Sequence, residues 1–302
     1  MSDILVDKQR ERNIFKVTIV GAIVNFLLIV YKFVAGILGH SAAMIADAMH
    51  SVSDFITDIV VIVCVRIANK PKDREHSYGH GKFETLATLI IGFVLLLVGL
   101  GIGWSSIGII WDVVIEGKQL RSPGMIALVA AFVSVISKEV LYWYTAIWGR
   151  KLKSPVVVAN AWHHRSDAWS SVASILGIGG AILLGNKWTI LDPLAALVVS
   201  IFIMKIAFGQ IKPAVDELME RSLPEEVENE ILKIVAGFSK VGQLHNLHTR
   251  RIGTRYAIEF HVRMPGNITL SEAHQAVTEI EIKLKEVYGA ATHVVIHMEP
   301  YK

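Results

Sequence analysis

Six apolar segments, each more than 20 residues long, constrain the fold of this chain more than any other feature of its sequence. They lie at about 14–36, 41–67, 83–112, 124–148, 156–184 and 189–211. An α-helix rises about 1.5 Å per residue, so each segment can cross roughly 30 Å of hydrocarbon. Charged residues make up 19% of the chain, whereas soluble domains contain about 25%. We therefore expect an α-helical membrane protein with six transmembrane helices.

The sequence after residue 211 is less apolar and has the pattern of a separate domain. Pro224 and the two glutamates after it mark the first turn of a helix that we expect to end near residue 236. Two strand-like runs, a second amphipathic helix and a last strand follow, at 243–252, 255–264, 271–288 and 292–298. We therefore expect two domains, residues 1–212 and 213–302, the second an α+β domain of order α-β-β-α-β.

Basic residues are distributed unevenly among the loops. Lys and Arg gather before the first apolar segment, between the second and third, and between the fourth and fifth, whereas the opposite loops hold only three. The positive-inside rule then places both termini in the cytoplasm. The polar N-terminal residues lack the apolar core of a cleavable signal peptide. We expect a multi-pass protein of the cytoplasmic (inner) membrane. The net charge of +3 and the absence of a basic run give no sign of a nucleic-acid partner.

Two apolar segments carry the same pair of ionisable residues. His50 and Asp54 are four residues apart in the second segment, and so are His163 and Asp167 in the fifth. Each pair therefore lies on one helix face. An ionisable side chain inside a membrane costs about 2.5 to 3.5 kcal/mol on insertion scales and needs a compensating partner. Both pairs fall near the midplane, so we expect one four-ligand metal site.

The types of ligand narrow the choice of metal. Two imidazoles and two carboxylates suit Zn²⁺, and they also accommodate Fe²⁺, Co²⁺, Mn²⁺ or Cd²⁺. The single cysteine, Cys64, excludes a site with several thiolates. When the ion leaves, protons rebind to the same groups, which is the physical basis of an antiporter. The alternative is that the two pairs are only polar contacts between membrane helices.

Other ionisable residues in these segments receive different expectations. Asp47 and Asp58 share a helix with the first pair, and we expect them to line the outer and inner water paths or to support the ligands. His164 is adjacent to His163 and points about 100° away from it. Lys32 and Lys138 have no expected role beyond pairing or snorkelling.

Two further groups outside the apolar segments have the residue types of metal sites. Asp73, His76 and His80 lie in a short cytoplasmic loop, with spacings that bring them together if the loop is helical. The C-terminal domain has a second set of candidate ligands, at His245, His261, His274, His297 and Glu299. A shared carboxylate flanked by imidazoles suits one or two Zn²⁺ ions. The alternatives are a solvated loop with incidental histidines and surface histidines at a dimer or sheet face.

Four stretches, in this order, resemble signatures of the cation diffusion facilitator family, in particular its bacterial zinc/iron efflux type. They are Ser41 with Asp47-Ala-Met-His50-Ser-Val-Ser-Asp54, His76-Ser-Tyr-Gly-His80-Gly-Lys82, His163-His-Arg-Ser-Asp167 and His297-Met-Glu-Pro300. The resemblance implies a homodimer of six-helix subunits in the lipid bilayer, each with a metallochaperone-like, ferredoxin-like cytoplasmic domain. It implies export of a divalent metal, with protons as counter-ions, by alternating access.

The resemblance also implies roles for individual residues. The transport site would be His50, Asp54, His163 and Asp167, and the other two groups would be cytoplasmic metal sites. Lys82 resembles the interlocking lysine at the base of the dimer, with Glu220 as its acidic partner. Some bacterial relatives have Asp where His50 stands and zinc-selective members often have His, so His50 favours Zn²⁺ over Cd²⁺. Such relatives end the last strand with His-x-Asp, whereas this chain has Glu299.

Two functions of other classes are weighed against transport. A membrane metalloenzyme needs a catalytic base beside its metal, and the chain has no His-Glu-x-x-His motif. A metal sensor that does not transport would use only the C-terminal domain, which leaves the membrane pairs without a purpose. We therefore expect a transporter and not an enzyme.

Overall fold

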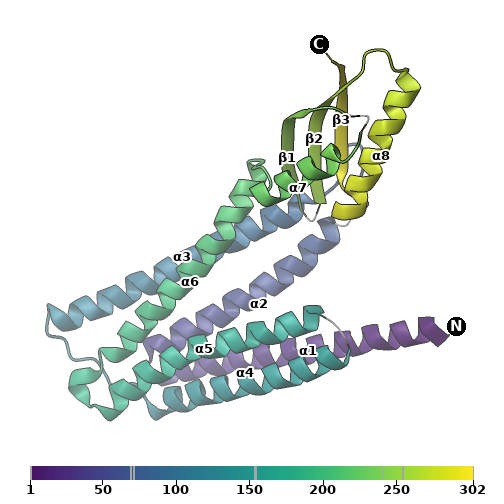
Figure 1. The fold of residues 1–302 in the computed structure, drawn as a ribbon. Helices are drawn as coiled ribbons and strands as arrows, with labels where there is room; N and C mark the ends of the chain where they lie inside the picture. The colour runs from purple at the N-terminus through teal and green to yellow at the C-terminus, as the bar shows by residue number, and fades with distance from the viewer. Residues whose placement is uncertain are drawn as a thin grey trace. The chain divides into compact units, whose positions relative to one another are not determined.

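The computed structural model describes residues 2–68, 70, 72–152, 155–239, 241–253 and 255–301, with some helical side chains in these ranges left out of the description (Figure 1). Its long helices are α1 (Ser2–Leu38), α2 (Ala42–Ala68), α3 (Lys82–Val114), α4 (Met125–Lys151), α5 (Pro155–Leu183) and α6 (Leu191–Leu218). A short 3₁₀ turn, η1 (Asn186–Trp188), precedes α6. The chain then forms α7 (Glu225–Ala236), β1 (Leu244–Ile252), β2 (Arg255–Met264), α8 (Leu270–Tyr288) and β3 (His293–Pro300).

The chain divides into two compact units, and their boundary falls within helices. The first unit consists of Met1–Ile59 with Gly92–Phe208, and the second of Val60–Ile91 with Gly209–Lys302. The predicted division at residue 212 stays a prediction.

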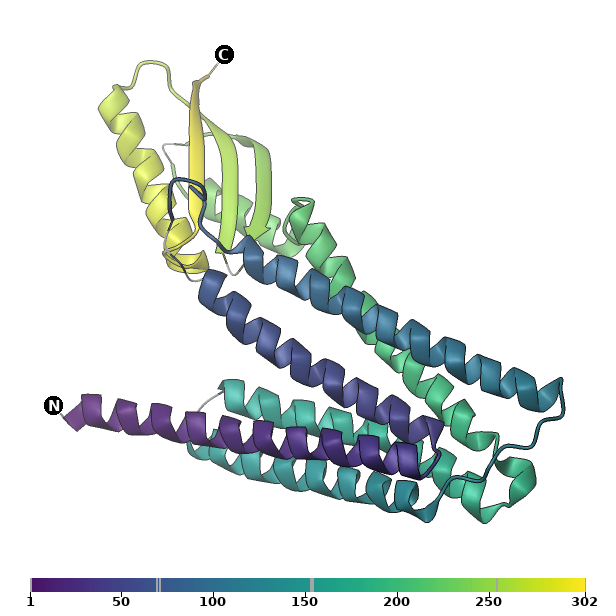
Figure 2. The same cartoon turned by 180° about the vertical axis from the view of Figure 1, so that it is seen from behind.

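The first unit is a layer of packed helices. In both views α4 runs beside α1 and α5 (Figures 1 and 2). Small residues allow the close contacts: a Cβ atom on Gly177 of α5 would lie 2.2 Å from the Cβ of Ala195 in α6. Close approach through small residues is typical of membrane helices, which gain little from burying apolar side chains against one another. Asp192 accepts hydrogen bonds from Ser41 Oγ and the Ala42 amide at the start of α2, both 2.6 Å long.

Four helical stretches in the described part of the chain are long and apolar enough to cross a membrane. They are Lys16–Leu38, Lys82–Val114, Met125–Lys151 and Asn186–Leu218. The predicted segments 41–67 and 156–184 correspond to α2 and α5, which contain side chains outside the described part. The helical membrane domain is therefore present, and the count of six spans stays a prediction. The first helix begins at Ser2, earlier than expected, because Lys, Gln, Arg and Glu residues favour helix.

The C-terminal part of the second unit is a three-stranded sheet with helices on one face (Figure 1). The strand order is β1-β2-β3, with β2 antiparallel to β1 and parallel to β3. Ile258, Phe260 and Val262 of β2 are buried together with Ile231 of α7 and Ile280 of α8. Successive side chains of a strand point to opposite faces, so the alternate residues of β2 lie on the face without helices.

The sequence patterns predicted the residue ranges of these C-terminal helices and strands accurately. The expected helix and strand ranges agree with α7, β1, β2, α8 and β3 to within two residues at each end. Helix α8 starts with a capping box, in which Thr269 Oγ1 accepts from the Glu272 amide and the Glu272 carboxylate accepts from the Thr269 amide. Such a cap satisfies amide groups that the first turn leaves without helical partners.

Candidate metal centres

The first candidate centre lies inside the helical unit, between α2 and α5. His50, Asp54 and Asp167 each offer one ligand atom, and these atoms lie within 4.8 Å of one another. His50 Nε2 lies 3.7 Å from Asp54 Oδ2, and the two side chains are 7% and 21% exposed. His50 Nδ1 is buried and has no hydrogen-bond partner among the described residues. Two buried groups and one half-buried group of ligand type, on two apolar helices, can coordinate a cation that compensates their charge.

A small cavity adjoins these groups. Its volume is about 20 Å³, and its lining includes Asn25, Ser51, Asp54, Lys138 and Asp167. A cavity of roughly 10–15 Å³ measured in this way holds one water molecule, so the space suits one ion or water. The Oδ1 atom of Asn25, on α1, is buried and has no hydrogen-bond partner in the described part of the chain. An amide oxygen is a suitable ligand for hard cations.

Asn25 was missed by the sequence analysis, because a single neutral amide in an apolar segment forms no pair with a spacing to recognise. A signal was nevertheless present. An uncompensated amide within a membrane helix is itself costly and therefore marks either a helix contact or a binding site.

Two buried lysines stand close to this centre. Lys138 Nζ on α4 lies 3.3 Å from Asp167 Oδ2, and the two side chains are 4% and 9% exposed. Lys32 Nζ on α1 lies 2.7 Å from Asp47 Oδ2, and both of these side chains are fully buried. Both lysines therefore form buried ion pairs and do not snorkel towards water.

Of the two expectations for Asp47, lining a water path or supporting the ligands from within the protein, its buried contacts agree with the second. Besides Lys32, its carboxylate accepts hydrogen bonds of 2.9 and 3.0 Å from Ser171 Oγ. Lys32 also donates to Ser51 Oγ over 3.0 Å. A carboxylate with a charged partner and a hydroxyl donor is satisfied within the protein, so Asp47 ties α2 to α1 and α5.

Some predicted positions are not described. The side chains of His163 and Asp58 lie outside the described residues, so the fourth ligand and the inner path stay predictions. His163 belongs to α5, one turn before Asp167. His164 is buried, and its Nε2 lies near Gly21 of α1, 3.7 Å from where a Cβ atom would be. Among the described residues, His164 does not belong to the group of His50, Asp54 and Asp167.

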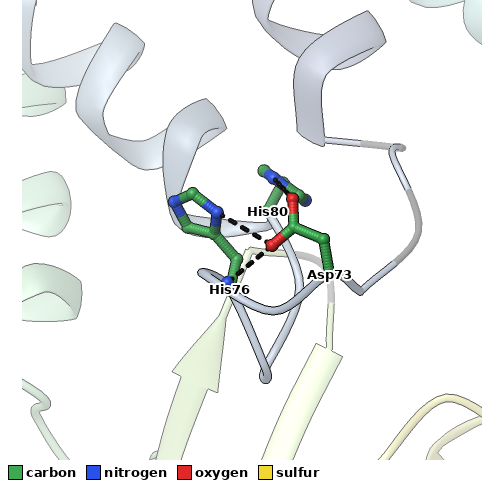
Figure 3. A group of neighbouring side chains, drawn as sticks. All are labelled: Asp73, His76 and His80. Atoms are coloured by element: carbon green, nitrogen blue, oxygen red, sulfur yellow. Dashed lines mark hydrogen bonds and ion pairs between the residues drawn. The ribbon is translucent and has the colours of Figure 1, made fainter.

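The second candidate centre is the loop between α2 and α3 (Figure 3). Asp73 lies between the two histidines: Oδ1 is 3.3 Å from His76 Nδ1, and Oδ2 is 3.3 Å from His80 Nε2. The two imidazole rings are 4.3 Å apart between centroids. The His76 amide, which donates to Asp73 over 2.6 Å, is the main cause that lowers the pKa of this carboxyl below its usual range. The carboxylate therefore stays ionised and is ready to bind a cation.

The loop brings the three ligands together without being helical. Asp73 Oδ1 accepts from the Glu75 amide over 3.0 Å, which forms a turn. A second turn is closed by the Gly79 amide, which donates to the His76 carbonyl over 2.9 Å. Gly79 has φ = 88°, a conformation that glycine adopts without strain. The spacing would bring the three side chains together in a helical loop, and here two turns bring them together instead.

The third candidate centre lies on the sheet face without helices. His245, His261 and Glu299 each offer a ligand atom within 4.8 Å of the others. Glu299 Oε1 is 3.0 Å from His261 Nδ1, and Oε2 is 3.2 Å from His245 Nε2. His245 pairs with His261 and His261 with His297 across the strands, so three adjacent strands supply the group. The hydrogen bond from His261 is the main cause that lowers the pKa of Glu299 below its usual range.

The other predicted residues of this domain are less close. His297 Nε2 lies 4.0 Å from Glu299 Oε1, at the edge of the group. His274 is exposed on α8 and lies outside the three-residue group. A β-bulge lies between His245 and His248, where Asn246 has φ = 52°. The bulge directs His245 to the ligand face.

The predicted salt-bridge pair is also close. Lys82 Nζ at the start of α3 lies 3.0 Å from Glu220 Oε1, just after α6. The hydrogen bond from Lys82 is the main cause that lowers the pKa of Glu220 below its usual range.

Models of two families match nearly the whole chain. The model described as the cation efflux transmembrane domain matches residues 18–219, and the one described as the cation efflux protein, cytoplasmic domain, matches residues 223–301. The chain belongs to the cation diffusion facilitator family. The resemblance seen in the four signature stretches is thereby confirmed, and this cation diffusion facilitator consists of a helical membrane domain followed by the cytoplasmic domain of the family. Its placement in the bacterial zinc/iron type stays a prediction.

The cation diffusion facilitator is similar over most of its length to named relatives. It is 35% identical to Metal tolerance protein C1 of Arabidopsis thaliana, over 94% of this chain and 62% of that protein. It is 31% identical to the manganese efflux system protein MneP of Bacillus subtilis, over 97% of this chain and 98% of that protein. The metal-bound C-terminal domain of the CzcD transporter from Thermotoga maritima is 26% identical, covers 25% of this chain and 87% of its own, and has a TM-score of 0.24.

Proposed function

We propose that this protein is a homodimeric Zn²⁺/H⁺ antiporter that exports Zn²⁺ from the cytoplasm by alternating access. In this proposal residues 1–212 cross the cytoplasmic (inner) membrane six times, both termini are cytoplasmic, and residues 213–302 form the cytoplasmic domain. The observation that carries the proposal is the convergence of His50, Asp54 and Asp167 beside a one-ion cavity in an apolar helical unit. His163, one turn before Asp167, is proposed as the fourth ligand.

The proposed coupling to protons follows from charge compensation. Asp54 and Asp167 together balance the charge of one divalent ion. Without the ion, the same groups are ionisable and largely withdrawn from water, and proton binding lowers their cost. A metal ion and protons therefore compete for the same ligands, and transport in opposite directions follows from that competition.

Export of Mn²⁺ is the second candidate function. It is supported by the similarity to MneP, which is named as a manganese efflux protein and is matched over 98% of its length. It is also supported by Asn25, whose buried amide oxygen adds a hard donor to the lining of the cavity. Mn²⁺ favours oxygen ligands in octahedral arrangements, whereas Zn²⁺ prefers four ligands that include imidazoles. Fe²⁺, Co²⁺ and Cd²⁺ are further candidate cargoes, and a metal sensor that does not transport is the remaining alternative.

The two other centres are proposed as regulatory or structural Zn²⁺ sites on the cytoplasmic side. Asp73, His76 and His80 would hold one ion in the loop, and His245, His261, His297 and Glu299 would hold one or two on the exposed sheet face. His274 is proposed as a ligand from its sequence position alone. The ion pair of Lys82 and Glu220 is proposed to brace the base of the dimer.

The test is metal flux into proteoliposomes that contain the purified full chain. Zn²⁺ uptake accompanied by proton movement in the opposite direction is expected for the wild type, and Asp54→Asn and Asp167→Asn should abolish it. Asp112→Asn is the matched control, because this exposed carboxylate pairs with Lys118 and lies outside the cavity. Zn²⁺ flux at the wild-type rate in Asp54→Asn would overturn the proposed site. A higher rate for Mn²⁺ than for Zn²⁺ at equal concentration would instead favour the second candidate.

A further inference from the structure

Lys138 contacts a proposed ligand of the transported ion, although it has the same charge as that ion. Its ammonium lies 3.3 Å from Asp167 Oδ2 and lines the same small cavity as Asp54 and Asp167. A cation placed in that cavity would be a close neighbour of the ammonium. Because like charges repel strongly where the dielectric constant is low, the metal and this ammonium compete for the Asp167 carboxylate.

The charges of the described groups are consistent with Asp167 exchanging one cationic partner, the Lys138 ammonium, for another, the metal ion. Lys32 and Asp47 balance each other, which leaves Asp54, Asp167 and Lys138 beside the cavity. One divalent ion balances the two carboxylates, and the ammonium is then surplus. With no ion present, the ammonium balances one of the two carboxylates, and a bound proton can neutralise the other.

The two buried lysines differ in how firmly they are held. Lys32 contacts the Asp47 carboxylate and the hydroxyls of Ser51 and Ser171, at 2.7, 3.0 and 3.4 Å. Within the described part of the chain, Lys138 has one ion pair, with Asp167. Counting only the described residues, its release breaks one ion pair, whereas the release of Lys32 would break one ion pair and two hydrogen bonds.

A second position for the ammonium is available on the same helix. Ser134 lies four residues before Lys138, and its Oγ atom is buried without a hydrogen-bond partner among the described residues. Residues four apart on a helix are neighbours on one face. The hydroxyl of Ser134 is therefore an acceptor within reach of the flexible lysine side chain when Asp167 turns to a metal ion.

We propose that Lys138 is a tethered counter-cation, which pairs with Asp167 when the transport site has no metal and is displaced when the metal binds. This inference rests on the proposed function of the site. The pairing matters in the return step of transport, in which the protein changes from the outward-facing to the inward-facing state with no metal bound. Buried carboxylates without a counter-charge are costly, so the paired ammonium makes the return of the empty carrier easier.

The inference separates two modes of transport. Net export needs the empty carrier to return, whereas exchange of labelled Zn²⁺ for unlabelled Zn²⁺ does not. Lys138→Met removes the competing cation, so the KM for Zn²⁺ should fall about tenfold, a change equivalent to about 1.4 kcal/mol. Net flux should fall by a similar factor because the empty carrier returns slowly, while Zn²⁺–Zn²⁺ exchange should continue at nearly the wild-type rate.

The experiment measures both modes in proteoliposomes with the full-length protein and Zn²⁺ as the probe. Lys138→Arg keeps a cation and should retain most of the net flux. Lys151→Met is the matched control, because Lys151 lies at the exposed end of the same helix, where it contacts the Trp148 ring. A Lys138→Met protein with unchanged KM and unchanged net flux would overturn the inference. Equal loss of exchange and net flux would also overturn it, because Lys138 would then serve only the structure.

Failure of the proposed function would look different. In that case Asp54→Asn would carry Zn²⁺ in both modes at the wild-type rate, whatever Lys138→Met does. If Asp54→Asn abolishes Zn²⁺ transport but Lys138→Met changes net flux and Zn²⁺–Zn²⁺ exchange equally, the proposed transport site stands and only the proposed role of Lys138 is rejected.

Discussion

Lys82 Nζ lies 3.0 Å from Glu220 Oε1, which joins the first residue of α3 to the residues that follow α6. Glu220 has φ = 60°, a left-handed conformation that is uncommon for residues other than glycine. Its Oε1 atom also lies 3.8 Å from Arg250 Nε on β1. The strained backbone at Glu220 therefore places one carboxylate between two cations of different elements.

The ion pair of Lys82 and Glu220 should make the stability of the folded protein depend on pH in the acidic range. Because Lys82 lowers the pKa of Glu220, the folded protein gains stability above the ordinary carboxyl pKa and loses it as the pH falls through the lowered value. Glu220→Gln should remove that part of the acid dependence and cost no more than about 1 kcal/mol at neutral pH, since the pair is exposed. Thermal unfolding of both proteins from neutral to acidic pH measures it. Parallel curves would contradict the prediction.

The buried pair of Lys32 and Asp47 should matter far more for stability. Asp47→Ala leaves a fully buried ammonium without its carboxylate, and loss of one partner of a buried pair costs about 3–5 kcal/mol. The double variant Lys32→Met/Asp47→Leu removes both charges and should recover most of the loss. The unfolding temperature in detergent reports both effects, with Asp112→Ala as the exposed control. A double variant less stable than Asp47→Ala would show that the charges act separately.

Asn25 should influence which metal the protein prefers. Asn25→Leu replaces a buried amide oxygen of the cavity lining with an alkyl group of similar size. If the oxygen contacts the cargo, flux of Mn²⁺ should fall more than flux of Zn²⁺, because Mn²⁺ favours oxygen ligands. The comparison uses competing fluxes of the two ions in one preparation. Asn229→Leu, at an exposed position on α7, should leave the ratio unchanged, and an unchanged ratio in Asn25→Leu would refute the prediction.

The parts of the structure that depend on local pattern could be predicted from the sequence. The i,i+4 spacing of His50 and Asp54 fixes their common helix face, and the alternation of β2 fixes which of its side chains are buried. The turn at Gly253 and the acidic first turn of α7 similarly mark where elements begin and end.

Contacts between distant residues could not be predicted in this way. The pairing of Lys138 with Asp167 depends on how α4 packs against α5, and no spacing within one helix encodes it. The bulge at Asn246 and the two turns that bring Asp73, His76 and His80 together depend on backbone torsion angles. A helical loop predicts the same convergence, so the spacing of these residues alone could not distinguish the two structures.

In the C-terminal centre, the roles of Glu299 and His274 in metal binding can be tested separately. Glu299 bonds to His261 and His245 from one chain, whereas His274 lies apart from them on α8. If Zn²⁺ binds this group and draws two cytoplasmic domains together, the distance between labels on the two domains of a dimer should shorten when Zn²⁺ is added. Glu299→Gln should abolish the change, because it removes the charged ligand shared by both histidines, and EDTA should reverse the change in the wild type.

His274→Ala should retain the response if the ligands come from the strands alone. Loss of the response in His274→Ala would instead show that α8 contributes a ligand in the metal-bound dimer, and an unchanged distance in the wild type would reject the metal-driven approach of the domains.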